Sequence, residues 1–154
     1  MKLYIMQHGD AVSKEENPDR PLSSQGIKDV EHIAQFVANA GVGVKHVIHS
    51  GKTRALQTAE IMANAIAPQG EIETNPQLNP NDPVSHILEQ INQMHEDILI
   101  TGHLPFVAKL VAQLVSSDEN NDIVAYTPGS IVCLEPSDRG WSIAWMIRPA
   151  IMKQ

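Results

Sequence analysis

The sequence predicts an α/β fold, a three-layer α/β/α sandwich in which helices cover both faces of a mostly parallel sheet of about six strands. Two observations predict this class. Short apolar runs alternate with longer segments whose apolar residues recur at helical spacing, which is typical of a sheet covered by helices. The 154 residues are 42% hydrophobic and 19% charged, an ordinary globular composition. A chain of this length buries about two-thirds of its unfolded surface in one core, so we expect one domain over residues 1–154.

The short apolar runs are the expected strands, because turn residues bound each of them. They lie at residues 2–6, 45–49, 71–74, 97–101, 130–135 and 141–147. Three stretches rich in Pro, Asn, Asp, Glu or Ser are expected to be surface loops. These stretches are residues 15–21, 75–83 and 116–121.

Helices are expected between the strands. The first runs from Ser23-Ser24 to Gly41, since glycine is favoured just past a helix end. The second covers residues 53–66 and the third residues 84–95, and the fourth begins at Pro105, a favoured first-turn residue. The apolar residues whose spacing supports the first and fourth ranges are Ile27, Val30, Ile33, Val37, Val107, Leu110, Val111 and Leu114. In the third helix the residues expected to face inward are Ile87, Leu88, Ile91 and Met94.

Charge and composition exclude several function classes. The formal net charge is −7 and the Lys and Arg residues are scattered, so a nucleic acid backbone would be repelled. The apolar run Leu3–Met6 is too short for a signal peptide or a membrane span, and we expect a cytoplasmic protein without a membrane partner. Cys133, the sole cysteine, lies in an apolar run and is interpreted as a buried hydrophobic residue rather than a catalytic thiol.

Three segments share one order: an apolar strand, a turn of small residues with a polar group, then a helix or loop. They are YIMQHG, VIHSGKTR and ILITGHLP. Ligands of open α/β sheets bind beyond the carboxyl ends of the strands, so we expect His8, Arg54 and His103 to converge there. Arg54 stands in the first turn of its helix, where free N–H groups favour an anion, and its guanidinium favours phosphate.

Each of these residues also has a structural interpretation: His8 or His103 taken separately is equally compatible with a surface or satisfied core histidine, and only together with Arg54 do they favour a site. Arg54 alone is equally compatible with a solvated helix residue that pairs with a nearby acid such as Glu60. His49 ends a strand but can point sideways. The remaining histidines lack turn signals and are interpreted as surface or satisfied core residues: His32, His46, His86 and His95.

Five motifs follow one another along the chain: QHGDA, RPLSSQG, SGKTRALQTAE, TGHLP and the late strand entered through Pro128-Gly129-Ser130. With them the chain resembles the histidine phosphatase (phosphoglycerate mutase-like) superfamily, and specifically its small SixA-type phosphohistidine phosphatases. The resemblance spans nearly the whole chain. It implies a phosphoglycerate mutase-like fold in a single histidine phosphatase domain without lid insertions.

The resemblance also implies a mechanism. His8 would take the phosphoryl group as a covalent phosphohistidine that water hydrolyses. Arg54 would bind the phosphoryl oxygens, His103 would donate hydrogen bonds, and Gln7 and Arg20 would be further phosphate contacts. No cofactor and no metal is implied, although zinc is an alternative use of clustered histidines. The implied substrate is phosphohistidine in a partner protein such as a phosphotransfer domain of signal transduction, and phosphate or a sulfate-like anion should occupy the pocket.

The chain departs from the family pattern at two points. Gln7 stands where the first motif normally has arginine, and a neutral donor contributes about 0.5–1.5 kcal/mol against about 1.5–3 for a charged one, so binding should weaken roughly ten-fold. Without that arginine, His8 should also protonate at a higher pH. The proton donor is the second departure, and its candidates are Asp82, Glu16 and Asp19. A phosphohistidine substrate relaxes the need for a donor, because its imidazole can be protonated from solvent.

Two further functions stay open at this point. The first is a catalytically weak or inactive module of the same fold that binds phosphate or a phosphoprotein. The second is a phosphatase for small phosphate esters, although an alkoxide leaves poorly without a proton donor.

Overall fold

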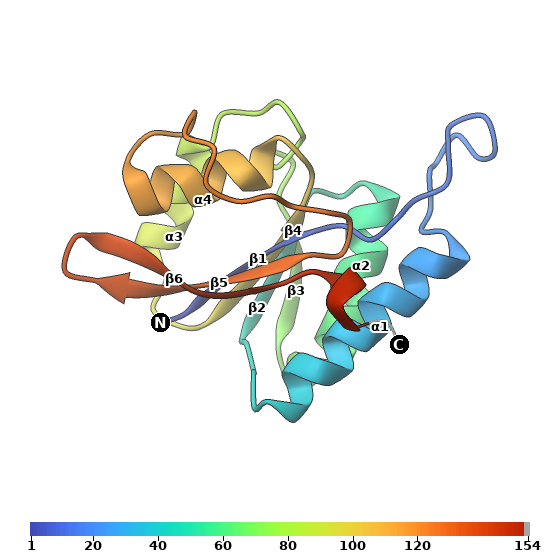
Figure 1. Ribbon diagram of the computed structural model, residues 1–154, viewed down its shortest axis with the longest axis horizontal. Coiled ribbons are helices and arrows are strands. Elements are labelled where there is room, and N and C mark those ends of the chain that lie inside the picture. The colour runs from blue at the N-terminus through green and yellow to red at the C-terminus, as the bar shows by residue number, and fades with distance from the viewer. Residues whose placement is uncertain (153–154) are drawn as a thin grey trace.

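The computed structural model describes residues 1–152, which form a six-stranded mixed sheet with helices on both faces (Figure 1). The strand order is β3-β2-β4-β1-β5-β6. The parallel strands are β1 (Leu3–Gln7), β2 (His46–His49), β3 (Glu71–Thr74) and β4 (Ile98–Gly102). β5 (Ile131–Ser137) pairs antiparallel with β1, and β6 (Gly140–Ile147) pairs antiparallel with β5. The predicted α/β class with a mostly parallel sheet is confirmed.

The helices lie close to their predicted ranges. They are α1 (Ser24–Asn39), α2 (Thr53–Ile66), α3 (Ser85–Gln93) and α4 (Phe106–Ser116), with a short 3₁₀ helix η1 (Pro149–Met152) after β6. The predicted end of the third helix is wrong by two residues, because Met94 already has an extended backbone. Gly41 follows the end of α1 with a φ of 88°, a conformation that glycine adopts without a steric penalty.

Side chains alternate between the two faces of the sheet, as a strand period of two requires. Leu3 and Ile5 pack with residues of α3 and α4, whereas Tyr4 and Met6 pack with residues of α1 and α2. Cys133 is 1% exposed and belongs to the α1/α2 side, so its predicted burial is confirmed.

Two residues differ in exposure from what their local sequence suggests. The segment 75–83 is a loop of exposed and partly exposed residues, as expected, but Leu78 within it is fully buried among core residues on the α3/α4 side. Local composition could not show this, because the core face that Leu78 covers is built by distant strands. In α1, Ile27 has the helical spacing of the core residues but is 37% exposed, since it lies at the margin of the buried stripe.

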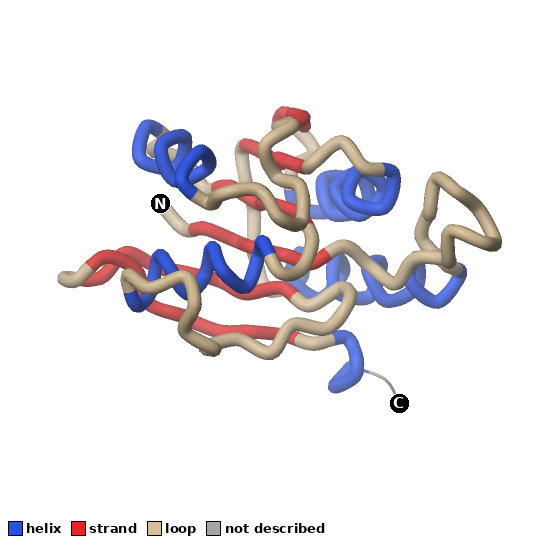
Figure 2. Tube along the Cα trace, turned by 90° about the horizontal axis from the view of Figure 1, so that it is seen from above, coloured by secondary structure: helices blue, strands red, loops and turns tan. Residues whose placement is uncertain are grey.

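The strand order decides where the turns meet. β4 lies between β1 and β2, with Gln7 opposite Gly102 and His49 opposite Thr101. The residues that follow these three strands therefore emerge at one edge of the sheet. The loop between β1 and α1 projects outward from the same edge (Figures 1 and 2). Across residues 1–152, no helix combines the length and apolarity that crossing a bilayer requires.

Candidate active site

The structure brings His8 and His103 together. The backbone N–H of His8 donates to the carbonyl of Gly102 at 2.9 Å, which extends the β1–β4 ladder past the strand end. The two imidazole rings lie with centroids 5.1 Å apart and planes tilted by 54°. Two histidines separated by most of the chain thus share one small space, because their strands are parallel neighbours.

The Gly9 carbonyl determines the tautomer of His8. Nδ1 of His8 lies 2.7 Å from that carbonyl oxygen, which can only accept, so Nδ1 carries the proton and Nε2 keeps its lone pair. The pKa of His8 is lowered to about 4, mainly by burial and further by Arg54 and Arg20, while the bond to Gly9 opposes the shift. Burial therefore keeps the His8 ring neutral even though Gln7 carries no charge.

Tight packing holds the His8 turn against α1 and α2. A Cβ on Gly9 would lie 2.7 Å from Cγ2 of Val30 in α1, so only glycine fits without a shift. The N–H of Gly9 donates to Oγ1 of Thr58 at 3.0 Å, and that hydroxyl donates to the carbonyl of Arg54 at 2.8 Å. Thr58 therefore couples the His8 turn to the first turns of α2.

Ser50 orients His103. The His103 side chain is 1% exposed, and its Nε2 lies 2.6 Å from Oγ of Ser50. Ser50 Oγ also accepts from the N–H of Lys52 at 3.3 Å, which leaves the hydroxyl proton for His103. The pKa of His103 is lowered to about 3, first by burial and then by His8, Arg54, Lys52 and Arg20. We infer a neutral ring whose proton is on Nδ1, an atom that has no hydrogen-bond partner within residues 1–152.

Arg54 and Arg20 supply positive charge beside these rings. Arg54 lies in the first turn of α2, and its Nε is buried with no hydrogen-bond partner in the described part of the chain. Burial and then Arg20 lower the pKa of Arg54. Arg20 has a φ of 48°, which a non-glycine residue seldom adopts, and its Nε donates to the carbonyl of Val12 at 3.0 Å. Two guanidinium groups that repel each other at close range favour an anion between them.

A cavity of about 410 Å³ opens beside the two arginines, and most of its charged lining is cationic. The residues that line it are Lys14, Pro18, Asp19, Arg20, Gly51, Lys52, Thr53, Arg54 and Pro80. Lys14 and Lys52 were not among the predicted site residues. Lys52 and Ser50 could have been found, because both stand in the SGKTR turn, whereas nothing in the local sequence distinguishes Lys14.

Gln7 is buried at the end of β1. Its side chain is 7% exposed, and Oε1 has no hydrogen-bond partner among residues 1–152. Its backbone is fully engaged, since the N–H donates to Ser130 and the carbonyl accepts from Gly129. The amide therefore has free hydrogen-bonding capacity and carries no charge.

The three candidate proton donors separate clearly. Asp19 lines the cavity. Asp82 instead accepts from the N–H of Asn79 at 2.9 Å and so stabilises its own turn, and it does not line the cavity. Glu16 is exposed and does not line the cavity. Only Asp19 is placed beside the arginines.

His49 points away from this centre and holds the following turn. Its Nδ1 accepts from the N–H of Gly51 at 3.0 Å, and Nε2 lies 3.5 Å from Oγ1 of Thr74. The one group of three potential metal ligands in residues 1–152 is also elsewhere, at His46, Glu71 and Glu73. The chemistry of the centre thus rests on two neutral imidazoles and two guanidinium groups.

A family model described as the histidine phosphatase superfamily (branch 1) matches residues 3–82, more than half of the chain. The chain belongs to this superfamily. Similar members include the phosphohistidine phosphatase SixA of Escherichia coli (strain K12), 27% identical over 158 residues that cover 99% of this chain and 97% of that protein. An uncharacterised protein of Picosynechococcus is 35% identical over 116 residues, which cover 68% of this chain and 67% of that protein.

The fold of this histidine phosphatase is similar to solved structures along its whole length. The structure of SixA complexed with tungstate superimposes with a TM-score of 0.87 at 25% identity and covers 99% of this chain and 100% of that one. The resemblance that the sequence motifs indicated is therefore confirmed for the family and for the fold.

Proposed function

We propose that the chain is a phosphohistidine phosphatase, which removes the phosphoryl group from phosphohistidine in a partner protein through a covalent intermediate on His8. The state of His8 carries the proposal. The ring is neutral, its Nδ1 is held by the Gly9 carbonyl, and its Nε2 is free, with Arg54 and His103 near the ring. A relative that matches over 99% of this chain is the phosphohistidine phosphatase SixA.

In the first step, Nε2 of His8 attacks phosphorus and the P–N bond to the substrate imidazole breaks. The leaving ring takes a proton from water or from Asp19, which lines the cavity. In the second step, water attacks the phosphorus on His8, the new P–N bond breaks, and phosphate leaves with the proton that water releases. Nε2 of His8 regains its lone pair, and whichever group protonated the leaving ring recovers a proton from solvent, so the cycle closes without a cofactor.

The charged groups match where charge develops. Arg54 would bind the phosphoryl oxygens, and Arg20 lies close enough to lower the pKa of both Arg54 and His8. His103 would donate from Nδ1, the ring nitrogen that Ser50 leaves free. Because these donors are already in position, little reorganisation is needed when charge builds up on the phosphoryl oxygens.

A protein substrate suits the surroundings of the pocket. The cavity is bordered by the exposed residues Lys14 and Lys52, whose flexible charged ends can meet an acidic protein surface. A single domain without a covering insertion would leave the pocket open to a phosphotransfer domain in the cytoplasm. Free phosphate or sulfate is the expected anion in the absence of that partner.

Gln7 favours a second candidate, a module that binds phosphorylated protein with little turnover. The residue places a neutral, buried amide where the family pattern has an arginine. Weak stabilisation of the transition state would leave binding largely intact and slow the chemistry.

The test uses a protein carrying ³²P-phosphohistidine and a rapid alkaline quench. The proposal expects label on His8 early in the reaction and free phosphate later, with both lost in His8→Ala. Tight binding of the labelled protein without label transfer would support the module instead. Comparable rates on simple phosphate esters would support an ester phosphatase.

A further inference from the structure

A second cluster of reactive side chains lies at the other end of the parallel strands, away from His8. His46 begins β2, and Glu71 begins β3, the edge strand. His46 stands directly opposite Glu71 in the parallel register, and Glu73 is two residues further along β3. Because side chains alternate along a strand, these three share one face of the sheet. One nitrogen or oxygen from each lies within 4.8 Å of the others.

Two of these atoms are buried and unpaired. Nδ1 of His46 and Oε2 of Glu73 are both shielded from solvent, and neither has a hydrogen-bond partner in residues 1–152. The nearest approach of Nδ1 to a carboxylate is 3.9 Å, to Oε2 of Glu71, which is too long for a hydrogen bond. His46 is thus partly exposed, as a surface residue would be, but its buried Nδ1 is not satisfied. Buried polar atoms in native proteins normally have partners, so these two call for a ligand.

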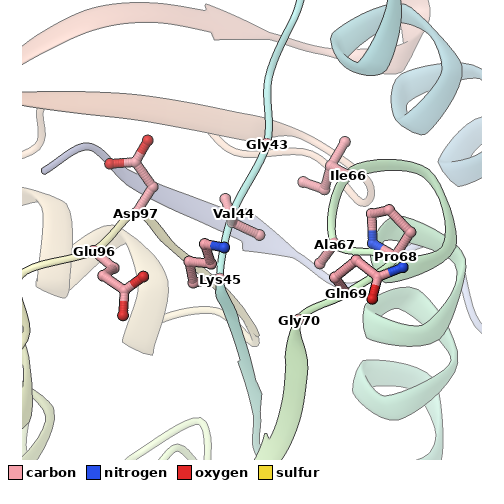
Figure 3. A pocket seen from close by; sticks show the side chains of 10 residues that line it. All are labelled: Gly43, Val44, Lys45, Ile66, Ala67, Pro68, Gln69, Gly70, Glu96 and Asp97. Atoms are coloured by element: carbon pink, nitrogen blue, oxygen red, sulfur yellow. The ribbon is translucent and has the colours of Figure 1, made fainter.

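Glu96 approaches the opposite side of the His46 ring. Its Oε1 lies 3.8 Å from Nε2 of His46. Figure 3 shows that the carboxylates of Glu96 and Asp97 point away from each other at the border of a cavity of about 470 Å³. Asp97 is occupied elsewhere, since it accepts from the N–H of Lys2 at 2.6 Å. At 3.8 Å the contact of Glu96 with Nε2 is, like that of Glu71 with Nδ1, too long for a hydrogen bond, so Glu96 acts on the ring through its charge: a metal bound at Nδ1 would leave the ring proton on Nε2, next to this carboxylate.

We propose that His46, Glu71 and Glu73 form a binding site for a divalent transition-metal ion such as Zn²⁺. One imidazole nitrogen and two carboxylate oxygens are a ligand set that Zn²⁺ accepts, with water completing the tetrahedron. The imidazole disfavours Ca²⁺ and Mg²⁺, which prefer oxygen ligands alone. Glu96 is a positioning residue for the ring. The ion would stabilise the pairing of the edge strand β3 with β2. It would take no part in the phosphatase reaction.

An ion pair is the competing explanation. A protonated His46 would attract Glu71 and Glu96 at 3.9 and 3.8 Å. That arrangement leaves the buried oxygen of Glu73 without a partner and does not explain why Glu73 lies beside His46 and Glu71. The metal site accounts for all three residues.

The test titrates Zn²⁺ into the full chain, freed of metal by a chelator, and follows binding by calorimetry and the rise in Tm. One high-affinity ion is expected. Glu71→Gln, Glu73→Gln and His46→Gln should each weaken binding at least about ten-fold and reduce the rise in Tm at a given Zn²⁺ concentration, and Glu96→Gln should weaken binding about ten-fold. Glu71 is 73% exposed, so its variant keeps the fold.

Matched controls exclude other sites. His86→Gln and Glu89→Gln change the same residue types on the exposed surface of α3 and should leave Zn²⁺ affinity within about two-fold. His8→Ala should do the same if the phosphate pocket is not the site. Equal binding by Glu71→Gln, Glu73→Gln and the wild type, loss of binding in His8→Ala, or no binding to the wild type at millimolar Zn²⁺ would each overturn the proposal.

Discussion

Replacing Gln7 by arginine tests whether a neutral side chain limits this pocket. A hydrogen bond with a charged partner is worth about 1.5–3 kcal/mol against about 0.5–1.5 kcal/mol for a neutral one, so the gain between the midpoints is about 1.3 kcal/mol. That difference is roughly ten-fold in phosphate affinity. The gain in kcat/KM on a phosphohistidine protein should be at least as large, because the phosphoryl oxygens carry more charge in the transition state.

The structure also sets a cost for this substitution. Gln7 is only 7% exposed, so a longer side chain crowds its neighbours, which typically costs about 1–3 kcal/mol. The new charge would also join Arg54 and Arg20, whose mutual repulsion already lowers the pKa of Arg54. Without an anion, Gln7→Arg should therefore have a lower Tm than the wild type. Phosphate should raise the Tm of the variant more steeply, because the anion relieves the repulsion.

The assay measures Tm and phosphate affinity across a phosphate series, and turnover on the labelled protein. Gln69→Arg is the matched control, since Gln69 is exposed at the opposite end of the sheet and gains the same charge. Phosphate affinity of Gln7→Arg within two-fold of the wild type would refute the reasoning, because position 7 would then not reach the anion. Turnover in the variant alone would identify the natural chain as a binding module.

Three further predictions follow from the site. The pKa of His8 is lowered to about 4, so kcat/KM should fall only as the pH drops through about 4. The free energy of unfolding should decline as the pH falls from 6.5 toward 4, because over this range His8 takes up a proton in the unfolded chain but not in the folded one. An acid limb near 6.5 in the pH–rate profile would contradict this. Ser50→Ala should destabilise the protein by about 1–3 kcal/mol in urea and change the ¹⁵N shifts of the His103 ring, since Nε2 loses its partner; unchanged ring shifts would argue against the assigned tautomer. Gly9→Ala should cost about 1–3 kcal/mol through its clash with Val30, and Val30→Ala in the same chain should recover part of that loss. Strict additivity of the two changes would show that they do not meet.

Most secondary structure could be predicted because it depends on local periodicity. The helix expected over 53–66 is α2 with the same bounds, and each expected strand lies within two residues of the observed one. The convergence of His8 and His103 was also within reach, since parallel strands deliver their carboxyl ends to one edge. The order of the motifs is a property of the sequence alone, and it was sufficient to indicate the family, which the family model confirms.

The contacts within the site could not be predicted, because they join residues that are distant in the sequence. Ser50 and His103 are 53 positions apart, and only the placement of β4 beside β2 makes them partners. The same applies to Thr58, which accepts from Gly9 across the interface with α2. Sequence spacing likewise could not separate Asp19 from Glu16, because loop geometry decides which carboxylate lines the cavity.

By itself, the amino-acid sequence determined the fold class, the elements and the residue types at the strand ends, since apolar spacing and turn residues act over a few positions. Only the tertiary structure decided which nitrogen of each histidine is free, which acid lies near the arginines, and that His46 faces two glutamates. Protonation and pairing depend on burial and on neighbours within a few ångströms, and strand order supplies both. Whether Gln7 weakens the pocket likewise depends on its place in the fold, where a buried amide ends β1 next to the proposed nucleophile.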